Sequence, residues 1–273
     1  MAERNKQYVG VCGISTVEEA KRSVSLFREA GFDMKTAHIP MWGFQASWKT
    51  LAFGFSEGNR RVPTRDDLPY VLEAVNGEGF VTIHYYTKQP ELLVQQLRAL
   101  LELGAIYRRG LVDGVQLNKV WPTTAQMAEI KAEFPQLKII LQMSPHVTAG
   151  MSMEQVAVKL ANGYSGIDYI ILDSSGGRGI EFDMQAITSE YQTLKSGGVK
   201  SDIVFAGGFS GENVAEKLSG LIRATNTTSF SIDAEGGLRD KLGEGYGNDA
   251  FNAEKARTYL KGAAEVLLQG KRT

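Results

Sequence analysis

The sequence lacks the features that mark disulfide-bonded, membrane-spanning, secreted and nucleic-acid-binding proteins. Its 273 residues include a single cysteine, Cys12, which excludes an internal disulfide and fits a reducing compartment. No run approaches the ~20 apolar residues of a membrane span, and the first residues lack the apolar core of a signal peptide. Basic and acidic residues balance at 30 against 31, so no charge excess points to nucleic acid or an anionic membrane. We therefore expect a cytoplasmic protein with neither of these partners.

Histidine is also scarce, and its spacing indicates no metal site. His38, His84 and His146 do not lie at metal-ligand spacing, and none has a cysteine near it in the sequence. Each is interpreted as a hydrogen-bonded structural residue. The alternative for His38 and His84, on the second and third predicted strands, is that they line the barrel mouth, which depends on the direction of their side chains. The turn CGIST lacks the G-x-G-x-x-G pattern of a dinucleotide fold. The sequence therefore predicts neither a metal nor a cofactor.

What the chain does contain is a recurring unit of a short apolar run, a polar or glycine-rich loop and a helical pattern. The stretch 93–101 carries leucines at i, i+4, i+7 and i+8, which lie on one stripe of a helix, and 214–222 repeats this spacing. Eight runs rich in valine, isoleucine and aromatic residues predict strands buried on both faces. These runs are YVGVCGI, MKTAHI, FVTIHYY, GVQLN, KIILQM, DYIILD, DIVFAGG and SFSID.

Eight strands that alternate with helices predict a parallel sheet, because each return crossover needs a helix. Eight such units in 273 residues are typical of a closed (β/α)₈ TIM barrel, so we predict an α/β fold of this class, with residues 1–273 as a single domain. An open doubly wound sheet is the alternative. The aromatic and glycine-rich segment 40–67 predicts an enlarged connection that acts as a lid or specificity loop. Alternatively, LAFGF within this segment is itself the second strand.

In a barrel of this kind, chemistry lies where the strands end. Cys12, Asp173 and Asp233 end the first, sixth and eighth predicted strands, and glycine pairs follow the seventh and eighth. A partly buried carboxyl such as Asp173 suits a general acid, although a helix cap explains an aspartate there equally well. The glycines let backbone N–H groups approach a phosphate. Cys12 is either a small packing residue or a reacting thiol.

Several of these segments resemble motifs of the phosphoribosylanthranilate isomerase family of TIM barrels, in the order in which the family carries them. VGVCGIS resembles the family's KICGIT, and GVQLNK resembles its VQLHG. LDS followed by GGRGIEFDM resembles LDS…GGTGxxFDW, AGGFSGENV resembles AGGLxPENV, and SIDAEGGLRD is similar to VDVSSGVE. LAFGFSEGNRRV resembles the family's GFVFxxxSPRxV and is one residue shorter.

The resemblance implies an intramolecular aldose–ketose isomerase of tryptophan biosynthesis. Its reaction is an Amadori rearrangement of a phosphoribosylamine such as N-(5-phosphoribosyl)anthranilate by general acid–base catalysis. The motif positions imply Cys12 as the base and Asp173 as the acid. Neighbouring N–H groups or a basic residue would then lower the pKa of the Cys12 thiol toward neutrality.

The resemblance also implies the groups that hold a small phosphosugar substrate. The implied residues are Gly207, Gly208 and Gly237 for the phosphate, and Asp233 and Arg60 for the rest of the substrate. Arg60 is the match to the arginine that faces the anthranilate carboxylate, with Arg61 as the alternative.

The sequence departs from the family at two strand ends. Asn118 and Lys119 replace a His-Gly pair, and Glu235 and Gly236 replace Ser-Ser. A glutamate repels a phosphate, so either Glu235 points away or the ligand differs. Two alternatives stay open: a barrel of this type that acts on a different phosphosugar, and a non-catalytic barrel that binds a sugar phosphate or a protein partner. The sequence leaves the oligomeric state open.

Overall fold

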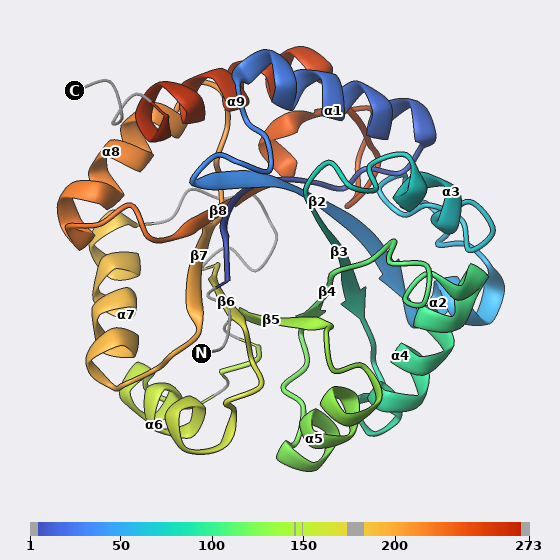
Figure 1. Cartoon of the computed structure of the whole chain (residues 1–273), viewed down its shortest axis with the longest axis horizontal. Coiled ribbons are helices and arrows are strands. Elements are labelled where there is room, and N and C mark those ends of the chain that lie inside the picture. The colour runs from blue at the N-terminus through green and yellow to red at the C-terminus, as the bar shows by residue number, and fades with distance from the viewer. Residues whose placement is uncertain (1–4, 145, 149, 174–182, 269–273) are drawn as a thin grey trace.

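The computed structural model describes residues 5–144, 146–148, 150–173 and 183–268. Eight parallel strands form a closed barrel in chain order, and pairing between β1 and β8 closes the ring (Figure 1). The predicted (β/α)₈ TIM barrel is therefore confirmed. The strands are β1 Gln7–Cys12, β2 His38–Ser47, β3 Phe80–Tyr86, β4 Gly114–Asn118, β5 Lys138–Met143, β6 Tyr169–Leu172, β7 Asp202–Ala206 and β8 Ser231–Ala234.

Helices surround the barrel, as Figure 1 shows. A hairpin of β9 (Arg239–Lys241) and β10 (Asp249–Phe251) follows the last barrel strand. Among the helices in the described part of the chain, none has both the length and the apolar character to cross a bilayer. The helices are α1 Val17–Ala30, α2 Trp48–Phe53, α3 Leu68–Glu73, α4 Leu93–Glu102, α5 Thr124–Glu133, α6 Met153–Gly163, α7 Met184–Ser196, α8 Val214–Thr225 and α9 Ala253–Leu267, with short 3₁₀ turns at Pro90–Leu92 (η1), Leu103–Ala105 (η2) and Gly236–Leu238 (η3).

Local sequence sets where several helices begin and end. The Thr16 side chain accepts a hydrogen bond from the Glu19 backbone N–H at the start of α1, and Gly31 ends that helix at φ 88°. Thr123 and Ser152 form capping boxes at α5 and α6. These caps satisfy backbone groups that a helix end leaves without partners, so they fix the register of each helix against the barrel.

Side chains alternate between the two faces of each strand, which creates two cores. On β1, Val9 and Val11 face the surrounding helices, whereas Tyr8 and Cys12 belong to the cluster inside the barrel. The rings of Tyr8, Phe80 and Tyr169 fill the barrel interior with centroids 5.4–5.7 Å apart. This interior becomes polar toward the carboxyl ends of the strands, and that is where a site can form.

The second strand differs from the sequence prediction. β2 begins at His38 and continues to Ser47, so it takes in residues 40–47, which were expected to belong to the enlarged connection. The connection between β2 and α3 is correspondingly shorter and contains α2. Residues 51–53 lie in α2, so the alternative that LAFGF forms the second strand is wrong.

Candidate active site

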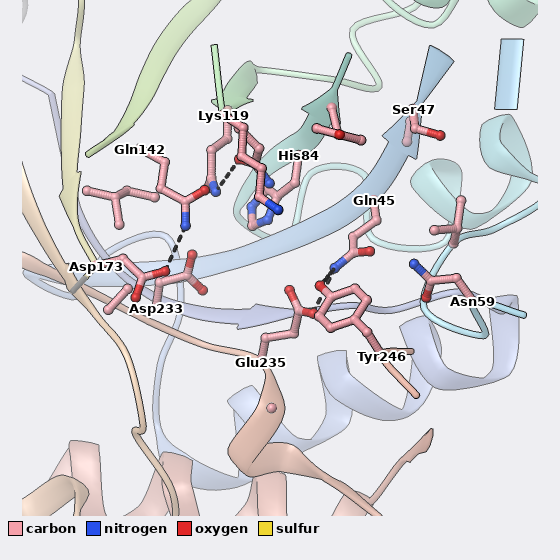
Figure 2. Close-up of a pocket in the computed structure, with 18 of the residues that line it drawn as sticks. Gln45, Ser47, Asn59, His84, Lys119, Gln142, Asp173, Asp233, Glu235 and Tyr246 are labelled. Carbon is pink, nitrogen blue, oxygen red and sulfur yellow. Dashed lines mark hydrogen bonds between the residues drawn. The ribbon is translucent and has the colours of Figure 1, made fainter. Parts of the chain in front are cut away.

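A cavity of about 520 Å³ opens at the carboxyl ends of the barrel strands. Its walls come from the ends of β2 through β8 and from the residues that follow them. Figure 2 shows that polar side chains project into this space from several strands. The labelled lining residues are Gln45, Ser47, Asn59, His84, Lys119, Gln142, Asp173, Asp233, Glu235 and Tyr246.

Asp173 directly follows β6 and lines the cavity, as the sequence predicted. It is 4% exposed, and the Gln142 side chain donates a hydrogen bond of 2.7 Å to its Oδ2 atom. The described residues show Asp183 as the cap of α7. Most of the GGRGIEFDM motif falls on residues 174–182, which lie outside the described residues.

Cys12 ends β1 inside the barrel but is absent from the described residues that line the cavity. Its thiol is 1% exposed and donates a hydrogen bond of 2.6 Å to Asp233 Oδ1. Burial raises the pKa of this thiol well above its ordinary value, and the negative charge of Asp233 adds to the effect. The prediction that neighbouring groups lower the thiol pKa is therefore wrong. Cys12 is a neutral donor beneath the cavity, and His84 and Asp233 are the neighbours that reach the cavity itself.

Asp233 belongs to β8 and points into the cavity beside these groups. Burial raises the pKa of its carboxyl, His84 and the Cys12 hydrogen bond oppose this rise, and the charges of Glu235 and Asp173 add to it. When such a carboxylate is ionised it is a stronger base than an exposed aspartate. Asp233 thus combines access to the cavity with a pKa shifted toward neutrality.

This raised pKa predicts how Asp233→Asn changes stability with pH. When the pKa of a carboxyl is higher in the folded than in the unfolded state, its protonated form stabilises the fold. This contribution is complete below the pKa of the unfolded state, about 3.9, and is lost as the pH rises through the pKa of the folded state. Asparagine does not ionise, so the free energy of unfolding of Asp233→Asn should improve relative to wild type from pH 4 to pH 7. Urea unfolding of both proteins across this range measures the difference. A difference that is independent of pH contradicts the raised pKa.

Glu235 does not present an uncompensated charge to a ligand. Its carboxylate forms an ion pair with Arg61 and accepts a hydrogen bond of 2.7 Å from Gln45 Nε2. Gln45 also donates to the Tyr246 hydroxyl, which the sequence did not single out (Figure 2). The repulsion expected from this glutamate is therefore largely offset by a buried guanidinium.

The two candidate arginines lie elsewhere than predicted. The Arg60 side chain is exposed and outside the described cavity lining, while its backbone N–H donates to the Gly247 carbonyl. Arg61 is buried between Asp249 and Glu235. None of the described residues that line the cavity is an arginine, and the lysines that reach it are Lys49 and Lys119. The structure thus places neither arginine in the cavity lining, and a contact between Arg60 and a substrate carboxylate stays a prediction.

The glycines predicted to hold phosphate all line the cavity. Gly207 and Gly208 follow β7 with φ values of 107° and 63°, a conformation that favours glycine. Gly237 has a packing reason of its own, because a Cβ atom there would lie 2.1 Å from the Phe209 carbonyl oxygen. Backbone groups at the ends of β7 and β8 therefore lie at the cavity, as a phosphate site requires. Phosphate binding itself stays a prediction.

The sequence interpretation missed Gln142 and left the direction of His84 open. Of the two alternatives for His84, the structure shows the second: it lies on the inner face of β3 and lines the cavity. Gln142 sits at the end of β5 and orients Asp173. A polar residue within an apolar run was the available signal for both, since alternation from the inward-facing Phe80 places His84 on the same side of the strand.

Comparison with known proteins supports the fold and leaves the activity open. No family model and no curated protein sequence matches the chain. Phosphoribosyl anthranilate isomerase from Thermus thermophilus is similar in structure, with a TM-score of 0.59 and 18% identity over 95% of this chain and 99% of that one. A phosphoribosyl anthranilate isomerase in complex with reduced 1-(o-carboxyphenylamino)-1-deoxyribulose 5-phosphate gives 0.57 and 17% over the same shares.

A tryptophan synthase structure from Mycobacterium tuberculosis is about as similar, with a TM-score of 0.60 and 14% identity over 96% of this chain and 92% of that one. At such low identities the likeness concerns the fold rather than a specific reaction. The family to which the motifs pointed is nevertheless among the structures found, over nearly the whole length of both chains. The chain therefore has the (β/α)₈ barrel fold of the phosphoribosyl anthranilate isomerase structures, at a divergent sequence.

Proposed function

We propose that the protein catalyses an intramolecular aldose–ketose isomerisation of a phosphoribosylamine, an Amadori rearrangement of the phosphoribosylanthranilate isomerase type. The observation that carries the proposal is that Asp173 and Asp233 enter one cavity, which is also lined by the glycines at the ends of β7 and β8. Similar barrels include one that binds a reduced analogue of an aminodeoxyribulose phosphate. Tryptophan biosynthesis in the cytoplasm is the corresponding biological setting.

The two carboxyls suit the two proton transfers of this reaction. Asp173, held by Gln142, donates a proton to the ring oxygen of the sugar, and the ring opens to a protonated imine. Asp233 then takes the proton from C2, and the electron pair of that bond moves to form an enolamine. Reprotonation at C1, with loss of the proton from the C2 hydroxyl, gives the 1-amino-2-ketose. A carboxyl with a raised pKa is an effective base for the second step.

Cys12 acts in this proposal through Asp233, as a positioning residue. Its thiol donates to Asp233 Oδ1 from beneath the cavity, which orients the carboxylate and limits how far its pKa rises. The assignment differs from the role implied by the sequence motif, in which the sulfur itself takes the C2 proton. The two roles give different results on substitution.

Cys12→Ser keeps a hydroxyl donor to Asp233, so we expect it to retain kcat within about 10-fold of wild type. Cys12→Ala removes the donor, and the loss of a hydrogen bond to a charged group, about 1.5–3 kcal/mol, corresponds to roughly 10–100-fold in kcat. Steady-state kinetics of the two variants measures this difference. If both variants instead lose about 10²–10⁴-fold, the sulfur is the base.

The function itself is tested with the purified full-length chain and N-(5-phosphoribosyl)anthranilate. We expect conversion to 1-(o-carboxyphenylamino)-1-deoxyribulose 5-phosphate, which chromatography detects. We also expect that expression of this chain restores growth of a tryptophan auxotroph that lacks the isomerase. Asp173→Asn is the matched negative control, because it preserves size and a hydrogen-bond acceptor. Failure of both assays overturns the proposal for this substrate.

A different amine substituent on the sugar is the second candidate, and the arrangement of arginines favours it. Arg61 is engaged by two carboxylates, and the exposed Arg60 does not reach the described cavity lining, so the anthranilate carboxylate lacks the partner that the motif implied. A panel of phosphoribosylamines with uncharged aglycones distinguishes the candidates. Turnover of these and not of the anthranilate compound supports the second.

A further inference from the structure

Three potential metal ligands meet at the floor of the cavity. They are Cys12 at the end of β1, His84 on β3 and Asp233 on β8, and their ligand atoms all lie within 4.8 Å of one another. Cys12 Sγ is 2.6 Å from Asp233 Oδ1 and 3.9 Å from His84 Nε2. Each of the three residues is more than nine-tenths buried. A thiolate, an imidazole and a carboxylate together form a donor set suited to Zn²⁺ and related transition cations.

The strand between β1 and β3 is shaped to let these side chains meet. This strand is β2, and beside Cys12 it carries Gly43, with which Cys12 pairs in register. A Cβ atom at Gly43 would lie 2.5 Å from both Cys12 Sγ and His84 Nε2. The space that any other residue would fill is therefore taken by the sulfur and the imidazole, which converge over the glycine from two different strands.

The distances are close to those of a tetrahedral site. With Zn–S near 2.3 Å and Zn–N or Zn–O near 2.0–2.2 Å, two ligand atoms at a tetrahedral angle lie about 3.5 Å apart. The sulfur–nitrogen distance is slightly longer and the sulfur–oxygen distance shorter, since a proton now bridges the thiol and Asp233. A cation that replaces this proton requires the Asp233 oxygen to move away from the sulfur by about 1 Å.

The surroundings provide both access and a favourable charge. His84 and Asp233 line the cavity, so a cation reaches the cluster through it and keeps one coordination position toward it. The carboxylates of Asp173 and Glu235 act electrostatically on Asp233, and Arg61 neutralises part of the Glu235 charge. Three protein ligands and one open position are typical of catalytic zinc sites, whereas structural sites use four protein ligands.

We propose that Cys12, His84 and Asp233 bind a single divalent cation of the zinc class, with its open position toward the cavity. A cation held there polarises a carbonyl or hydroxyl oxygen of a small-molecule ligand. The proposal goes beyond the isomerisation and does not depend on it, because it concerns binding of a metal alone. In the metal-bound form Asp233 is a ligand and no longer a proton acceptor, so occupancy and isomerisation compete for the same carboxylate.

Cobalt is the probe, because it reports a thiolate ligand directly. The chelator-treated full-length protein is titrated with Co²⁺, and we expect a thiolate-to-cobalt charge-transfer absorption that saturates at one ion per chain and disappears on addition of Zn²⁺. Since Cys12 is the sole cysteine, this absorption reports no other site in the protein. Zn²⁺ should also raise the Tm of the wild type, since a ligand that binds only the folded state stabilises it.

Variants test each ligand separately. Cys12→Ser should abolish the charge-transfer absorption, and His84→Gln and Asp233→Asn should each weaken Co²⁺ affinity by at least about 10-fold. His146→Gln is the matched control, because His146 is exposed and lies outside the cavity lining. Circular dichroism establishes that each variant is folded, and a second readout is the loss of the Zn²⁺-dependent Tm shift.

The proposal is overturned if folded wild-type protein shows no charge-transfer absorption at millimolar Co²⁺. It is also overturned if the absorption survives His84→Gln and Asp233→Asn with unchanged affinity, since the sulfur would then bind the ion without them. Neither result decides whether the metal-free protein turns over a phosphoribosylamine, so failure of the metal site and failure of the isomerase are distinguishable.

Discussion

Asp173→Asn is expected to reduce kcat for the isomerisation by about 10²–10⁴-fold, the contribution of a positioned general acid. Asparagine has nearly the same shape, and its side-chain oxygen still accepts the hydrogen bond from Gln142, but it has no proton to transfer to the ring oxygen. Substrate binding should change much less, so kcat and kcat/KM fall together while KM stays within a few-fold of wild type. Steady-state kinetics at saturating substrate measures both parameters.

The control for this substitution is Asp66→Asn. The Asp66 side chain is 88% exposed and forms a surface ion pair with Arg65, so its loss should leave kcat unchanged. If Asp173→Asn retains wild-type kcat, the ring-opening proton comes from elsewhere in the cavity. In that case the assignment of the acid is incorrect, even if the isomerisation itself is observed.

Asp249→Ala is expected to lower the free energy of unfolding by about 3–5 kcal/mol, because it leaves buried charges without their partner. Asp249 accepts hydrogen bonds from Arg61 Nε at 3.1 Å and from Arg239 Nε at 2.5 Å. The side chains of all three residues are less than one-tenth exposed. Without the carboxylate, Arg239 loses this ion pair and Arg61 keeps Glu235, in a site that water barely reaches.

Equilibrium unfolding in urea measures this loss, with Asp240→Ala as the control. Asp240 lies on the same hairpin, but its side chain is half exposed and pairs with Lys255 at the surface, so its removal should cost less than about 1 kcal/mol. Equal losses for the two variants would mean that the buried ion pairs contribute no more than the exposed one. The ion pairs of Asp249 would then contribute little to the free energy of unfolding.

The sequence was a good guide to strands that are uniform in character. FVTIHYY, GVQLN and KIILQM coincide with β3, β4 and β5, because each is an apolar run with clear boundaries. β2 was harder, since it contains Pro40 and Gly43, which ordinarily indicate a loop. The structure explains both: Pro40 pairs only with β1, because β3 joins the sheet one residue later, and Gly43 makes room for Cys12 and His84.

The parts of the candidate site that lie at strand ends could be predicted from the sequence, whereas those that depend on contacts between distant residues could not. Asp173 and Asp233 reach the cavity because each ends an apolar run, and that position can be read from the chain. The burial of Arg61 depends on Asp249, which comes 188 residues later, and no local pattern joins them. For His84, alternation along β3 gives the side chain's direction only once Phe80 is known to face the barrel interior.

Because the single thiol is buried, its chemical modification in the unaltered protein measures how often the barrel opens. Cys12 is 1% exposed between its neighbouring strands, so an alkylating reagent, which is larger than a metal ion, reaches it only when that part of the sheet separates transiently. The rate of its modification under native conditions, relative to that of a free thiol, therefore gives the equilibrium constant for this opening. No label has to be introduced, and the measurement reports on the point where the first and last strands close the ring.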